Sequence, residues 1–127
     1  MSDNVYQEKL MEHFKNSKYR KTIENPDFSS GQQNPSCGDS ILIEGKFENK
    51  NSDQLKIKEL GFSGSGCVVS QASASMLLQS CIGKTPEEIL NIGKDDIVKL
   101  VGIPLGPNRI KCALLSLEAL KAAFKKN

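Results

Sequence analysis

Asn34-Pro35-Ser36-Cys37-Gly38-Asp39 is the stretch around which the rest of the chain is organised. It ends a polar segment, residues 17–35, and leads into a run of alternating apolar and polar residues, 40–48. Two later segments each supply one more cysteine in an unusual setting, Gly64-Ser65-Gly66-Cys67 and Arg109-Ile110-Lys111-Cys112. Cysteines beside glycines and cations are more typical of sites than of cores, so we expect the three segments to meet.

The composition is that of a folded domain. The chain of 127 residues is 38% hydrophobic and 25% charged, which predicts a single domain, residues 1–127, with a modest core. The net charge of +2 is too small to indicate binding to nucleic acid or to a membrane surface. No apolar run reaches the length of a membrane span, and residues 1–8 lack the apolar core of a signal peptide. We therefore expect a cytoplasmic protein.

That compartment decides how the four cysteines are interpreted. Two disulfides are one interpretation, but thiols stay reduced in the cytoplasm. Clustered cysteines in a cytoplasmic protein more often bind metal or take part in chemistry.

Hydrophobic periodicity predicts an α+β fold, in which helices pack on a small antiparallel sheet of about three strands. Residues 40–48 and 54–62 alternate as the two strands of a hairpin whose turn is residues 49–53, and three glycines then interrupt the second strand. Residues 17–35 read as a loop with a short strand near Arg20–Ile23. The predicted helices are residues 3–16, 68–82, 86–92, 95–101 and 108–125.

Cys37 and Asp39 form the first pair of candidate ligands. Two residues apart, they point to the same side of an extended chain, and Gly38 between them allows the backbone to bend. A sulfur and a carboxylate suit zinc or iron. By itself the triplet is a weak signal, because a strand-entry cysteine beside a turn aspartate is equally ordinary.

Cys67 and Cys112 are both predicted near the start of a helix. The partial positive charge of a helix N-terminus favours a thiolate, and Arg109 and Lys111 add cations beside Cys112. For Cys67 a buried, unreactive cysteine remains an equal alternative. Cys81 lies near the end of a helix without such neighbours, and we interpret it as structural. His13, the only histidine, is more typical of a surface or half-buried residue than of a ligand.

Taken together, these segments resemble the IscU/SufU/NifU N-terminal scaffold family of iron–sulfur cluster assembly. The resemblance covers nearly the whole chain. It rests on four stretches: Glu12-His13-Phe14-Lys15-Asn16, Asn34-Pro35-Ser36-Cys37-Gly38-Asp39, Phe62 to Ser75 around Cys67, and Arg109-Ile110-Lys111-Cys112-Ala113.

The resemblance implies the IscU/NifU-like fold, a cysteine desulfurase partner and iron–sulfur acceptor proteins. It also implies a site of Cys37, Asp39, Cys67 and Cys112 for a [2Fe–2S] cluster or Zn²⁺, with Arg109 and Lys111 in support. The IscU branch has a histidine directly before the third cysteine, where this chain has Lys111, as the SufU branch does. The chain nevertheless lacks the insertion that SufU proteins usually carry between the second and third motifs.

Two functions follow, and both stay open at this point. In the first, the chain accepts sulfur and is a scaffold for a transient [2Fe–2S] cluster, with Asp39 as the easily displaced ligand. In the second, Zn²⁺ occupies the site and a released cysteine takes a persulfide, so that the protein is a sulfurtransferase. The persulfide acceptor is Cys37 by analogy with SufU, or Cys112 by analogy with IscU. A structural zinc module is the least favoured alternative, because such a site needs no cations beside its thiolate.

Overall fold

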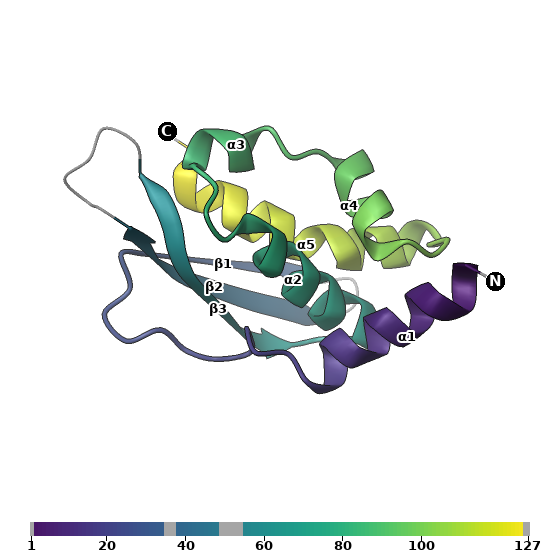
Figure 1. Ribbon diagram of the computed structural model, residues 1–127. Coiled ribbons are helices and arrows are strands. Elements are labelled where there is room, and N and C mark those ends of the chain that lie inside the picture. Colours follow the sequence, from purple (N-terminus) through teal and green to yellow (C-terminus); the bar gives the residue numbers. More distant parts are fainter. Residues whose placement is uncertain (1, 35–37, 49–54, 126–127) are drawn as a thin grey trace.

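The computed structural model describes residues 2–34, 38–48 and 55–125, and it has the predicted α+β architecture (Figure 1). Within these ranges it contains the strands β1 (Phe28–Asn34), β2 (Asp39–Glu48) and β3 (Lys56–Ser65). The helices are α1 (Ser2–Lys15), α2 (Val68–Cys81), α3 (Pro86–Leu90), α4 (Lys94–Val101) and α5 (Pro107–Phe124).

The three strands form one antiparallel sheet in the order β1-β2-β3. The predicted hairpin of β2 and β3 is confirmed, with Ile43 opposite Phe62. Its turn, residues 49–53, lies outside the described residues. At the other end of β2, Asn34 of β1 pairs with Asp39, so the first motif spans the connection between two neighbouring strands. This places Asp39 at the end of the sheet where the central strand, β2, begins.

The prediction of a loop over residues 17–35 was wrong in its second half, which contains β1. The sequence Phe28-Ser29-Ser30-Gly31-Gln32-Gln33-Asn34 has one apolar residue, so it carries no alternating pattern. Ladder hydrogen bonds to β2 and packing beneath α5 make it a strand instead. The short strand predicted near Arg20–Ile23 is reduced to an isolated bridge between Arg20 and Phe62.

The glycines after residue 60 do not interrupt β3, which continues to Ser65. At Gly64 the backbone has φ 135°, and a β-carbon there would lie 2.2 Å from the carbonyl oxygen of Ser40. Glycine is thus the residue that lets β3 stay paired to β2 at this close approach. The strand delivers the chain directly to Cys67.

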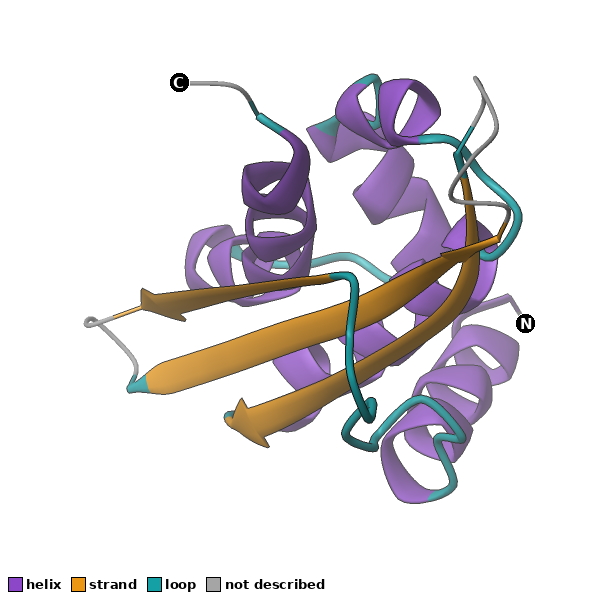
Figure 2. Ribbon diagram, turned by 90° about the vertical axis from the view of Figure 1, so that its left-hand side faces the viewer, coloured by secondary structure: helices purple, strands orange, loops and turns teal. Residues whose placement is uncertain are grey.

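Helices α2 and α5 cover one face of the sheet, and α1 packs beside α2 (Figure 1). In Figure 2 the strands lie in front of these helices, so the layers are one of sheet and one of helices. As predicted, α2 is buried on nearly all sides, and it ends where Gly83 adopts φ 87°. Thr85 opens α3 with a capping box to Glu88. Packing of α2 against α1, α5 and β3 holds in place the helix that Cys67 directly precedes.

Candidate metal centre

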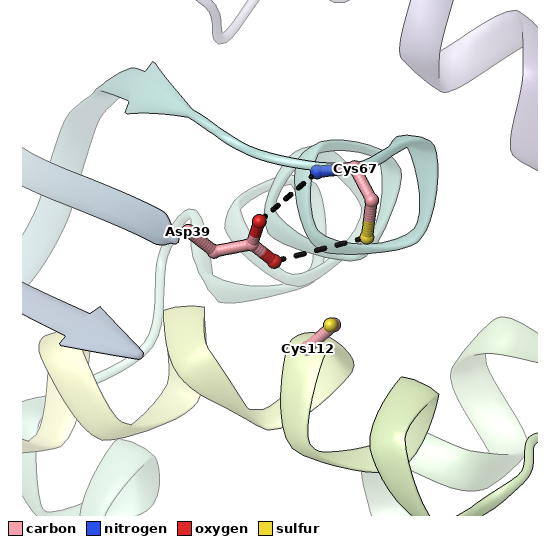
Figure 3. A group of neighbouring side chains, drawn as sticks. All are labelled: Asp39, Cys67 and Cys112. Carbon is pink, nitrogen blue, oxygen red and sulfur yellow. Dashed lines mark hydrogen bonds between the residues drawn. The ribbon is translucent and has the colours of Figure 1, made fainter. Parts of the chain in front are cut away.

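Three of the predicted site residues come together at one end of the sheet (Figure 3). Asp39 begins β2, Cys67 directly precedes α2, and Cys112 lies on α5. One ligand atom from each, a carboxylate oxygen and two sulfurs, lies within 4.8 Å of the other two. Cys37 lies outside the described residues, so its place as the fourth ligand stays a prediction.

Asp39 is a buried carboxylate with 4% of its surface exposed. The backbone amide of Cys67 donates a hydrogen bond to its Oδ1 at 3.3 Å, and the Cys67 thiol lies 3.8 Å from its Oδ2. Gly38 before it has φ 74°, a turn rather than the extended geometry considered for the Cys37-Gly38-Asp39 triplet. Asp39 is therefore oriented by the second motif as well as by its own strand.

Cys67 occupies the N-cap of α2, with φ −71° and ψ 170°. The backbone amide of Ser70 donates to its Sγ at 3.4 Å, as in an N-cap whose acceptor is sulfur instead of oxygen. The Ser70 hydroxyl donates to the carbonyl oxygen of Cys67 at 3.1 Å. Sγ of Cys67 thus contacts both the Ser70 amide and the Asp39 carboxylate, yet the side chain remains exposed, so a partner protein or a metal can reach it.

The residue before this cysteine, Gly66, has no space for a side chain. A β-carbon at residue 66 would lie 2.4 Å from Oγ of Ser70 and 3.0 Å from Cγ and Oδ1 of Asp39. Without a β-carbon, the backbone at residue 66 can approach this closely. The group that it approaches is the Asp39 carboxylate.

Cys112 is buried, with 6% of its surface exposed. The sequence predicted it near the first turn of the last helix. Since α5 begins at Pro107, Cys112 lies in the second turn, where the effect of the helix dipole has faded. Arg109 and Lys111, predicted to support the site, are exposed at the start of α5. Burial next to Asp39 and Cys67, rather than a place at the helix end, brings Cys112 into the site.

Cys81 lies in the hydrophobic core with no exposed surface. Burial raises the pKa of its thiol to about 11, against smaller opposing effects of the Ser80 hydroxyl and Lys84. A thiol that stays protonated is a poor ligand and a poor nucleophile. The structure thus agrees with a structural role for Cys81.

His13 is half-buried and contacts α2 rather than the cysteines. Its Nδ1 lies 2.8 Å from the hydroxyl of the fully buried Ser75, and Ser17 donates to that same hydroxyl at 2.6 Å. These bonds fasten the end of α1 to α2. The expectation that His13 is not a ligand fits this arrangement.

The donor set of two sulfurs and one oxygen fits a thiophilic metal that accepts a mixed site. Ligand atoms around tetrahedral zinc lie about 3.5–3.8 Å apart when the bonds have ordinary lengths of about 2.0–2.3 Å. The separations of up to 4.8 Å therefore need only a small contraction. Zinc and iron both take thiolate together with carboxylate, so the geometry admits either.

Sequence reasoning missed two residues that shape this site, Ser70 and Gln71. Ser70 supplies two of the hydrogen bonds to Cys67, and Gln71 donates from Nε2 to the carbonyl oxygen of Gly66 at 2.9 Å. The signal for Ser70 is weak: it follows Cys67 by three positions, the spacing at which a backbone amide bonds to an N-cap side chain. Nothing in the sequence singles out Gln71, because its role depends on the turn that it contacts.

Comparison with known proteins agrees with the fold. The family described as the NifU-like N terminal domain matches residues 5–127. The chain belongs to this family. Among its NifU-like relatives is the zinc-dependent sulfurtransferase SufU of Bacillus subtilis, 33% identical over 98% of this chain and 92% of SufU. The scaffold protein IscU of Thermotoga maritima is 32% identical over 96% of this chain and 94% of its own.

Solved NifU-like structures show the same architecture. A SUF-system scaffold protein of Fervidobacterium islandicum, described as putative in its crystal structure, superposes with a TM-score of 0.77. It is 28% identical and covers 98% of this chain and 100% of its own. Within the described residues, no helix of this NifU-like chain combines the length and apolarity needed to cross a membrane.

Proposed function

We propose that this protein works in iron–sulfur cluster assembly, accepting sulfur from a cysteine desulfurase and holding a nascent [2Fe–2S] cluster for delivery to acceptor proteins. The observation that carries the proposal is the group of Asp39, Cys67 and Cys112, whose ligand atoms lie within 4.8 Å of one another at the end of the sheet. Cys37 is the proposed fourth ligand. Two named relatives, SufU and IscU, support this assignment to cluster assembly.

In this scheme the cluster is the cargo, and the residues differ in how firmly they hold it. Thiolates of Cys67 and Cys112 bind iron strongly, whereas the carboxylate of Asp39 is a harder ligand that a partner can displace. Asp39 is held by the Cys67 amide, so it has an alternative partner when it leaves the iron. The thiolates would let the cluster form, and the weakly bound carboxylate would let it be transferred to an acceptor protein.

Sulfur arrives by thiol–persulfide exchange. A thiolate of this protein attacks the terminal sulfur of the desulfurase persulfide, a new S–S bond forms here, and the desulfurase cysteine leaves as a thiolate. The candidate acceptors are Cys37 and Cys112. Cys112 is only 6% exposed, so a transfer to it requires the site to open. This burial favours Cys37 as the first acceptor.

A second candidate function is zinc-dependent sulfur transfer. Its support is the similarity to SufU, which extends over 98% of this chain, and Lys111 in the position directly before Cys112. In this scheme Zn²⁺ binds the same four side chains and releases one cysteine to take the persulfide. A structural zinc module is disfavoured by the exposure of Cys67, because structural zinc sites are closed.

The deciding experiment starts from protein purified without oxygen from cells supplied with iron and zinc. Metal and sulfide are measured, and the metal-free protein is then incubated with iron and sulfide. A [2Fe–2S] spectrum at one cluster per site supports the scaffold. Stoichiometric zinc, no cluster, and a persulfide formed with a desulfurase support the sulfurtransferase. Zinc without persulfide formation leaves a structural module and contradicts both functions.

A further inference from the structure

The peptide unit that joins Gly66 to Cys67 is held at both of its polar ends. Its carbonyl oxygen, on Gly66, accepts a hydrogen bond from Nε2 of Gln71 at 2.9 Å. Its amide, on Cys67, donates to Oδ1 of Asp39 at 3.3 Å. Because a peptide unit is rigid and planar, with C=O and N–H pointing in opposite directions, fixing one end aims the other.

Gln71 holds the Gly66 end of this peptide from the first turn of α2, where it is half-buried and four residues beyond the N-cap. Only the amide NH₂ of its side chain can donate to a carbonyl, so the end of the amide that faces Gly66 is determined by chemistry. Capping of α2 does not need this bond. The Ser70 amide already has Sγ of Cys67 as its acceptor.

We propose that Gln71 is a positioning residue for the metal centre, acting through the Gly66–Cys67 peptide on Asp39. It aims the Cys67 amide at Oδ1, and Oδ2 then faces Sγ of Cys67 at 3.8 Å, on the side where the sulfurs gather. Gln71 thereby sets how the oxygen ligand is presented to the metal. The effect of Gln71 on metal binding rests on the proposed function, whereas its effect on the Gly66–Cys67 peptide does not.

Gln71→Met is the test variant, because methionine keeps the length of the side chain and its preference for helix while removing the donor. Gln79→Met is its matched control, the same change at an exposed position of the same helix. Both changes are made in the natural chain and in Asp39→Ala. The first measurement is hydrogen exchange of the Cys67 amide by NMR in the metal-free protein, and the second is the zinc dissociation constant by competition with a chelator.

We expect Gln71→Met to speed hydrogen exchange of the Cys67 amide and to weaken zinc binding. Each change should be about two- to tenfold, the range for one hydrogen bond. Gln79→Met should change neither by more than about twofold, an effect below that of one hydrogen bond. In the Asp39→Ala background the effect of Gln71→Met on both measurements should disappear, since the residue through which it acts is gone.

Two results would overturn the proposal. One is unchanged exchange of the Cys67 amide in Gln71→Met. The other is an equal effect of Gln71→Met with and without Asp39, which would show that Gln71 only stabilises the turn. If even the natural chain binds no zinc or iron, the proposed function fails, and the exchange data in the two backgrounds still decide whether Gln71 positions Asp39.

Discussion

Gly66 lies against Asp39 so closely that a methyl group on its α-carbon would stand 3.0 Å from both Cγ and Oδ1 of the carboxylate. Two residues 27 positions apart in the chain are therefore in close contact, with no room between them for another side chain. Glycine is needed at residue 66 because a larger residue would displace the neighbouring carboxylate of Asp39, a candidate metal ligand. This contact can be tested by a single substitution.

Gly66→Ala should displace the Asp39 carboxylate and weaken metal binding. The added methyl group would also lie 2.4 Å from Oγ of Ser70, so at least one of the two side chains must move. We expect a loss of stability of about 1–3 kcal/mol, typical of overpacking, and a larger dissociation constant for zinc. Gly93→Ala is the control, because its methyl group would meet only Oδ2 of Asp96 at 3.9 Å. Equal zinc binding by the two variants would contradict the close contact.

Asp39→Ala should distinguish a cluster scaffold from a zinc protein. With iron and sulfide, removal of the easily displaced oxygen ligand should lengthen the life of the cluster in air. With zinc, loss of one of four ligands should weaken binding by at least about tenfold. The measurements are the decay of visible absorbance and competition with a chelator. If neither metal responds, Asp39 is not a ligand.

The two buried cysteines should respond differently to serine. Cys81→Ser should keep the full metal content and lower the free energy of unfolding by about 1–3 kcal/mol, because it buries a hydroxyl in the core. Cys112→Ser should lose most of the metal, since it removes one of the grouped sulfurs. Metal analysis and urea unfolding of both variants test this contrast. Metal loss in Cys81→Ser would show that its role is misassigned.

Stability should fall in mild acid because of His13. Burial, followed by the charge of Lys9, lowers its pKa below the ordinary 6.5, while Glu12 acts in the opposite direction. Between the two pKa values the unfolded chain binds more protons than the folded one, so stability is full above about 6.5 and declines as the pH falls through the lowered value. Urea unfolding of the natural chain between pH 8 and 5 measures this.

His13→Gln is the comparison for that titration, since glutamine can also form a hydrogen bond with the Ser75 hydroxyl and carries no charge. The decline of stability below about pH 6.5, the ordinary value for histidine, should be smaller in the variant. An identical pH dependence in both proteins would assign the effect to other groups.

The sequence by itself determined most of the helices and the central hairpin. Alternation over residues 40–48 and the capping box at Thr85 and Glu88 are local signals. The buried face of a strand and the start of a helix each depend on a few neighbouring residues. It also singled out Asp39, Cys67 and Cys112, through the setting of each residue and a family resemblance.

Only the tertiary structure decided what depends on contacts between distant segments. The mostly polar segment Phe28–Asn34 is a strand because it forms ladder hydrogen bonds with β2 and packs against α5. Cys112 reached the site by burial from the second turn of α5 rather than by a place at its end. Even the nearby contact of Gln71 with the Gly66 carbonyl depends on the folded turn before α2, which brings the two groups within hydrogen-bond distance. Such roles carry no local pattern, because their energy comes from partners that the chain meets only once it is folded.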